Sequence, residues 1–183
     1  MPAKAYDPVL QAYVDDLNRL INSTISHDRL VLLELQGGSD VRQIVRFQDG
    51  RRLPIRLAPR GFLHFRQLVR RTGADVQTIE ALHILSESAN PDDEAEWILR
   101  YEYDRTPQPG KPQAHLHVNA ERKGVPLKHI HFPTGRISVE QLIAHLIMEH
   151  GVSASSADAL SLLAESHRGF QARRSDLSLD AFP

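Results

Sequence analysis

The chain has 183 residues, no cysteine and a formal net charge of -1. This length suffices for one domain with a substantial hydrophobic core, and the lack of cysteine excludes disulfides, zinc–thiolate sites and a cysteine nucleophile. No stretch approaches the ~18 consecutive apolar residues of a membrane span, and the first residues do not resemble a secretory signal. We therefore expect a cytoplasmic protein that does not enter a membrane.

Basic and acidic residues are separated along the chain. Nine arginines and one acidic residue lie between positions 42 and 71, and nine acidic residues and one arginine lie between positions 75 and 104. Such a basic block can form a patch for phosphate-bearing partners such as RNA, whatever the net charge. The alternative is that the two blocks face and neutralise each other, and the sequence leaves both hypotheses open.

The N-terminal region is predicted to form a helix followed by an antiparallel meander. Asp7 and Pro8 are typical of an N-cap and a first helical position, and apolar residues at helical spacing extend the helix over 8–22. Strands are expected at 30–35, 41–48 and 51–57, with a strong hairpin signal at Asp49-Gly50. If Val41, Val45 and Phe47 point inward, four arginines lie on the outer face as candidate nucleic-acid contacts: Arg42, Arg46, Arg52 and Arg56.

The middle of the chain is predicted to form a short helix and then a second set of strands. Residues 61–71 fit a helix with four residues on its buried stripe, Phe62, Phe65, Leu68 and Val69, and with Gly73 after its end. Strands are expected at 76–84, 96–104, 113–119 and 127–132, with an exposed loop at 86–94 and a Pro- and Gly-rich connection at 106–112.

The C-terminal region has the clearest helix signal. Ser138 and Gln141 have capping-box spacing before an amphipathic helix from Val139 to His150, and Gly151 follows it. A further helix is expected at 155–167, and residues 171–183 are expected to be a mobile tail. The order of elements predicts an α+β fold with an antiparallel sheet, in one domain of residues 1–170 with an N-terminal half (1–73) and a histidine-rich half (74–170).

Two His-x-His pairs mark the candidate functional site. Side chains alternate faces along a strand, so each pair projects to one side. In the strand 96–104 the apolar residues share one face, which leaves Arg100 and Glu102 on the other. Three strands thus place the candidate site residues on one surface: Arg100, Glu102, His115, His117, His129 and His131.

Three interpretations of this surface remain open, and the residues do not decide whether the protein is an enzyme. The first is metal-independent cleavage of a phosphodiester, with RNA as substrate and no cofactor. One histidine would take the 2'-hydroxyl proton, and another histidine or Glu102 would protonate the leaving oxygen, while Arg100 stabilises the transition-state charge. The arginine block would add affinity for the RNA backbone.

The second interpretation is a site for a divalent transition metal. A His-x-His strand offers two neutral nitrogens to one ion, and Glu102 or Glu121 could add oxygen. His115, His117 and Glu121 have the spacing of the first cupin motif, although the second motif is missing. The third interpretation is a non-catalytic protein-interaction module whose histidines lie on a solvated sheet face.

One segment resembles a known family. The run Trp97-Ile-Leu-Arg-Tyr-Glu-Tyr103, followed by His115-Leu-His117, His129-Ile-His131-Phe-Pro133 and a helix after Ser138, is similar to the TumE-like toxins over about residues 94–150. The resemblance implies a small bacterial ribonuclease that pairs with a helix-turn-helix antitoxin. The site positions that it implies are Arg100, Tyr101, His115, His117, His129 and His131.

Overall fold

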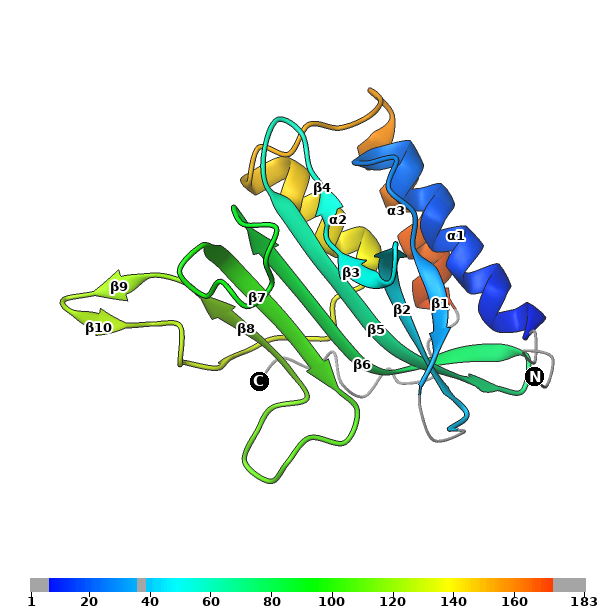
Figure 1. The fold of residues 1–183 in the computed structure, drawn as a ribbon, viewed down its shortest axis with the longest axis horizontal. Coiled ribbons are helices and arrows are strands. Elements are labelled where there is room, and N and C mark those ends of the chain that lie inside the picture. Colours follow the sequence, from blue (N-terminus) through cyan, green and yellow to red (C-terminus); the bar gives the residue numbers. More distant parts are fainter. Residues whose placement is uncertain (1–6, 36–38, 173–183) are drawn as a thin grey trace.

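The computed structural model describes residues 7–35 and 39–172, so the predicted tail lies outside the described residues except for its first two positions. The predicted α+β fold with an antiparallel sheet is confirmed. In the described part of the chain, three helices cover one face of a twisted sheet (Figure 1). None of the described helices has both the length and the apolar character needed to cross a membrane.

The main sheet is built from long antiparallel hairpins. Its central path has the order β1-β2-β5-β6-β7-β8-β11, and its strands are β1 (Val31–Glu34), β2 (Val41–Gln48), β5 (Phe62–Thr72), β6 (Asp75–Ser86), β7 (Trp97–Asp104), β8 (Ala114–Val118) and β11 (Phe132–Pro133). Two short strands flank this path, with β3 (Arg51–Leu53) paired to β2 and β4 (Ile55–Arg56) paired to β5. A separate small hairpin pairs β9 (Glu121–Arg122) with β10 (Val125–Pro126).

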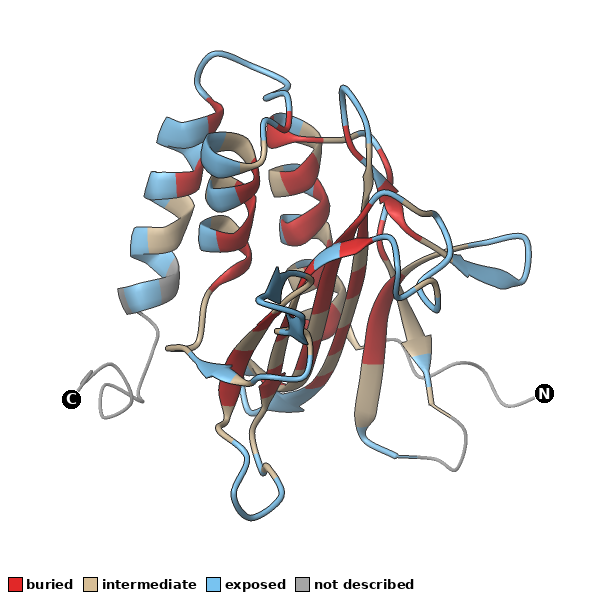
Figure 2. Ribbon diagram, turned by 90° about the vertical axis from the view of Figure 1, so that its left-hand side faces the viewer, coloured by how far each residue is buried: buried red, intermediate tan, exposed pale blue. Residues whose placement is uncertain are grey.

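Helices α1 and α2 begin where the sequence places their caps. Helix α1 (Pro8–Thr24) begins after Asp7, whose side chain accepts hydrogen bonds from two backbone N–H groups of the first turn. Helix α2 (Val139–Glu149) has the complete capping box of Ser138 and Gln141, and α3 (Ala159–Ala172) begins four residues later than predicted. Buried apolar residues of all three helices form one core with the covered face of the sheet (Figure 2).

The prediction of a helix at 61–71 is wrong, because these residues form the central strand β5. Leu63, Phe65, Gln67 and Val69 are buried in strict alternation. The polar Gln67 interrupts the apolar alternation of this face. The apolar residues Phe62, Phe65, Leu68 and Val69 then also have the spacing of one face of a helix. The long pairing with β6 decides the conformation, and Gly73 lies in the hairpin turn with a φ of 64°.

The predicted facing of β2 is also wrong. Ile44 belongs to the core under the helices, so alternation places Arg42 and Arg46 on that same face rather than on the outer one. Their guanidinium groups are neutralised at the border of the core, where Arg46 pairs with Asp28 at 3.0 Å and Arg42 with Glu34 at 3.5 Å. Apolar residues occur on both faces of β2, so its sequence has no clean alternation from which to assign them.

Candidate metal centre

Strands β7 and β8 bring four of the candidate site residues together. In the antiparallel register Arg100 lies opposite His117 and Glu102 lies opposite His115. Residues directly opposite each other share a face, and Leu99, Tyr101 and Tyr103 are buried on the other face. The predicted alternation is therefore confirmed from Leu99 onward. The prediction for Trp97 is wrong, because a register shift at this end of β7 places its ring on the side of Arg100, whose guanidinium carbon lies 5.2 Å from the ring centroid.

The prediction of a strand at 127–132 is wrong except at its last residue, Phe132, which belongs to β11. Residues 119–131 form an excursion, here called the arm, that leaves β8, forms the β9–β10 hairpin and returns to β11. The Ile130 N–H donates to the Leu127 carbonyl and closes a turn, so the chain is not extended here. Ile130 and Phe132, expected to point inward, are 43% and 38% exposed.

The turn in the arm brings one histidine to the sheet and leaves another outside. The ring of His131 stacks on His115 with centroids 4.5 Å apart, and meets His117 edge-on at 4.6 Å. His129 is exposed and does not join this group. The structure thus assembles three of the four histidines, and we call His115, His117 and His131 the histidine cluster.

Two rings of the histidine cluster are buried and, among the residues that the structure describes, have ring nitrogens that lack hydrogen bonds of normal geometry. His115 and His117 are 4% and 2% exposed, so the sheet face is not solvated at this point. The Nδ1 of His117 lies 2.9 Å from the Lys128 carbonyl. Within the described residues, the Nε2 of His117 and both ring nitrogens of His115 are buried without a hydrogen bond of normal geometry. Buried polar atoms of this kind are rare and require an explanation.

Glu102 links the histidine cluster to Arg100. Its Oε1 lies 2.7 Å from Arg100 Nε and 3.7 Å from His117 Nε2, and its Oε2 lies 3.5 Å from His115 Nε2. Burial lowers the pKa of both His115 and His117, although Glu102 acts in the opposite direction. For His117 the Lys128 carbonyl also raises the pKa, and the positive charge of Arg100 lowers it further. Both rings are therefore held in their neutral form.

The geometry of the histidine cluster suits a metal ion. The three imidazoles can each offer one nitrogen, and these nitrogens all lie within 4.8 Å of one another. In a tetrahedral zinc site with Zn–N bonds of about 2.0–2.1 Å, ligand nitrogens are about 3.4 Å apart. To hold zinc, the three nitrogens would have to move closer together than the upper bound of 4.8 Å.

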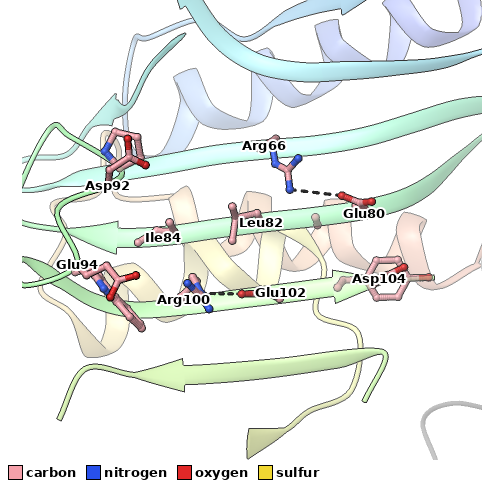
Figure 3. Close-up of a pocket in the computed structure, with 13 residues that line it drawn as sticks. Arg66, Glu80, Leu82, Ile84, Asp92, Glu94, Arg100, Glu102 and Asp104 are labelled. Carbon is pink, nitrogen blue, oxygen red and sulfur yellow. Dashed lines mark hydrogen bonds and ion pairs between the residues drawn. The ribbon is translucent and has the colours of Figure 1, made fainter. Parts of the chain in front are cut away.

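A groove of about 580 Å³ adjoins the histidine cluster on the same side of the sheet (Figure 3). Arg100 and Glu102 from β7 form one of its walls, and Arg66 and Glu80 form an ion pair at 3.5 Å across β5 and β6. Asp92 and Glu94 from the loop before β7 close one end. Because Glu102 belongs to both the groove and the surroundings of the histidines, a molecule in the groove would lie next to the histidine cluster.

The other residues singled out by the sequence do not join this site. Arg52 and Arg56 are exposed whereas Arg42 and Arg46 are largely covered, so these four arginines do not form one face. Ion pairs Arg66–Glu80 and Arg60–Glu87 join parts of the basic and acidic blocks. Glu121 is exposed on the arm. Tyr101 lies on the helix-covered face, where its hydroxyl accepts the Ile137 N–H.

Sequence reasoning missed the role of Lys128, whose backbone carbonyl orients the His117 ring. No side-chain pattern could reveal it, because the contact depends on the path of the arm. The two prolines that flank this path, Pro126 and Pro133, are the signals that argue against a continuous strand.

No known protein family, curated protein or solved structure matches this chain. The resemblance to the TumE-like toxins, and the RNA substrate and antitoxin partner that it implies, therefore stay predictions.

Proposed function

We propose that the histidine cluster is a centre for a divalent transition metal, with zinc as the simplest candidate. The observation that supports this most directly is the convergence of three imidazole nitrogens within 4.8 Å, two of them on buried rings. Neutral imidazole is the most common metal ligand in proteins, and the chain offers no thiolate. A metal would also account for buried ring nitrogens that otherwise lack a hydrogen bond of normal geometry within the described residues.

The tautomer of His117 supports the same proposal. A carbonyl oxygen can only accept a hydrogen bond, so the contact with Lys128 assigns the ring proton to Nδ1. The lone pair is then on Nε2, which lies 3.7 Å from Oε1 of Glu102. Metal-binding histidines typically donate their second ring N–H to a carbonyl or a carboxylate in this way, which fixes the ring for coordination.

Glu102 and the adjoining groove favour hydrolysis as the chemistry of this centre. Catalytic zinc sites use three protein ligands and leave one position for water or substrate. The carboxylate of Glu102 lies within 3.7 Å of the Nε2 atoms of His115 and His117. If a metal were bound, this carboxylate would be the residue to accept a proton from water in the open position. Arg100, which now pairs with Glu102, would stabilise negative charge that develops on the substrate.

The metal-free phosphodiesterase hypothesis needs a different charge state from the same residues. The form of this hypothesis in which a histidine is the general acid requires one protonated imidazole, but burial lowers the pKa of both His115 and His117. Their neutral form is the one that binds metals. For this reason the metal centre is the better proposal for these side chains, and metal-free cleavage stays a prediction.

Zinc affinity tests the proposal through single ligand substitutions. We expect His117→Ala and His131→Ala each to weaken binding by at least about a hundredfold, since loss of an outer-shell partner alone costs 10–100-fold. His129→Ala provides the matched control, because His129 is exposed on the same arm and should bind zinc like the wild type. Equal affinities for all four proteins in a chelator-competition titration would overturn the proposal.

The hydrolytic role of Glu102 needs a separate measurement. In zinc-loaded protein, Glu102→Gln should keep the metal and lose at least about a hundredfold in the hydrolysis rate of activated phosphate and carboxylate esters, as expected for removal of a general base. Unchanged hydrolysis by this variant would exclude Glu102 as the base while leaving the metal site intact.

A further inference from the structure

A second cavity lies on the other side of the sheet, away from the histidine cluster. It has a volume of about 980 Å³ and is lined by α1, by α3 and the start of α2, and by the helix-covered face of β5, β6 and β7. Small-molecule sites typically measure ~300–1,000 Å³, so the cavity is large enough for a ligand of nucleoside size. None of its lining residues belongs to the histidine cluster.

The register of the sheet explains why the cavity exists. Ala81 of β6 lies directly between Gln67 of β5 and Tyr103 of β7. The small side chain of Ala81 leaves a hollow between Gln67 and Tyr103, under the space between the helices. Above this hollow, Tyr13 of α1 donates its hydroxyl to the Gln67 side-chain oxygen at 3.1 Å.

The floor of the cavity is polar although the surrounding core is apolar. The floor residues are Gln67, Thr78, His83, Tyr101 and Tyr103, all buried and all lining the cavity. On the same face of the sheet, the neighbouring positions are Leu63, Phe65, Val69, Leu85 and Leu99. Burial of polar side chains costs free energy unless each one is hydrogen-bonded. Gln67 and Tyr101 are bonded to the Tyr13 hydroxyl and the Ile137 N–H, whereas the Nδ1 of His83 has no such bond within the described residues.

His83 is the strongest sign of a missing partner. The residue is 3% exposed, and within the described chain its Nδ1 is buried without any hydrogen-bond partner. Its ring packs between Phe65, with centroids 4.5 Å apart, and Tyr101, at 6.2 Å with the two rings nearly parallel. Burial lowers the pKa of His83 to about 3. The ring is therefore neutral, with one donor and one acceptor to offer.

The composition of the lining favours an uncharged ligand. The floor presents an amide, hydroxyls and a neutral imidazole, none of which holds a charge. Charged residues around the cavity have both signs in nearly equal number: Arg19, Arg105 and Arg136 against Asp16, Asp75, Glu140 and Glu165. The adjacent aromatic rings of the floor suit a planar molecule, because such rings stack favourably on flat π-systems.

From these observations we propose that the cavity between α1, α3 and β5–β7 is a binding site for a neutral planar heterocycle of nucleobase or nucleoside size. The heterocycle would lie over Ala81 and exchange hydrogen bonds with His83, Gln67 and Thr78. This site is independent of the metal centre, since the two lie on opposite faces of the sheet.

Imidazole NMR signals of the full-length protein test the proposal without any substitution. We expect at least one nucleobase or nucleoside among adenine, adenosine, guanosine, uracil and uridine to shift the His83 ring signals saturably and to raise the melting temperature. If a base and its nucleoside both bind, the sugar is not needed and the site recognises the base. Failure of every probe at millimolar concentration would overturn the proposal, as would a response confined to inorganic phosphate and benzoate.

Two variants make the test specific to the cavity. Ala81→Leu fills the hollow and should weaken binding of the active probe by at least about tenfold. Leu82→Met, on the opposite face of the same strand, is the matched control and should bind normally. The wild-type protein should bind the probe equally well with and without added zinc, which separates this site from the metal centre. Unchanged binding by folded Ala81→Leu would overturn the placement.

Discussion

Burial gives the histidines of this protein two different roles. In the histidine cluster, burial on the sheet keeps His115 and His117 neutral while Nε2 atoms remain available. On the helix-covered face, His83 packs against two aromatic rings, and burial together with the positive charge of Arg66 lowers its pKa. The first environment prepares a nitrogen for a metal, and the second prepares it for a hydrogen bond.

Proton release on zinc binding checks the charge state of the cluster. Three histidines with ordinary pKa values near 6.5 would together release about two protons at about pH 6. Because the pKa values of His115 and His117 are lowered, these two rings carry fewer protons at this pH, and we expect fewer than two protons to be released. Calorimetry in buffers of different ionisation enthalpy measures the number, and a value of two or more would contradict the account.

The stability of the protein should fall in acid because of His83. Its pKa is lowered to about 3 in the folded protein, so the unfolded chain binds a proton below the ordinary value of ~6.5 that the folded chain does not bind. Stability is then lost as the pH falls from ~6.5 toward 3, by about 2 kcal/mol between about pH 7 and about pH 4.5.

The substitution His83→Phe should remove this part of the pH dependence, because Phe keeps the ring contacts but cannot bind a proton. Urea unfolding at the two pH values measures the difference, with His129→Phe as an exposed control. If wild type and His83→Phe lost equal stability in acid, a proton on another group would have to explain the loss.

At the scale of the elements, strong N-cap signals correctly predicted helices α1 and α2. Weaker strand signals led to wrong predictions for residues 61–71 and 127–132. The caps of α1 and α2 involve neighbouring residues, so Asp7 and Ser138 could be recognised without tertiary information. For β5 the alternation of Leu63, Phe65 and Val69 was obscured by the buried Gln67. Its partner across the helix–sheet interface is Tyr13, which the sequence does not place nearby.

The N-cap of α2 provides a stability prediction for one element. The Ser138 side chain accepts the Gln141 N–H at 3.2 Å and lies 3.0 Å from His167 Nδ1 on α3. Replacing Ser138 by Ala should cost about 1 kcal/mol of unfolding free energy, as typical for a lost helix cap. The exposed Ser161 of α3 is the control, because Ser161→Ala should change stability by less than ~0.5 kcal/mol. Equal effects of both substitutions in urea unfolding would contradict this role.

At the scale of the whole molecule, the sequence predicted the class of fold and half of the site geometry. The β7 and β8 strands alternate cleanly, which placed Arg100, Glu102, His115 and His117 on one face. The third histidine depends on the arm, a turn-rich segment whose path follows from its contacts with the sheet. A pattern of alternation cannot show that His131 folds back while His129 points away.

The arm is expected to respond to the metal. Its contacts with the histidine cluster are the ring of His131 and the Lys128 carbonyl, and residues 120–126 are exposed. Zinc should therefore slow amide hydrogen exchange in residues 127–131 by at least about tenfold, because local opening would require release of a ligand. The β5–β6 hairpin is the internal control. Identical exchange in the arm with and without zinc would show that His131 is not a ligand.

The central claim is that three histidines hold one metal ion, and anomalous X-ray scattering from crystals of untagged protein grown with zinc tests it most directly. We predict one peak at the zinc absorption edge among His115, His117 and His131, and its disappearance in crystals of His117→Ala. The absence of a peak from the histidine cluster in the wild-type crystals, or a peak held by other residues instead, would contradict the account.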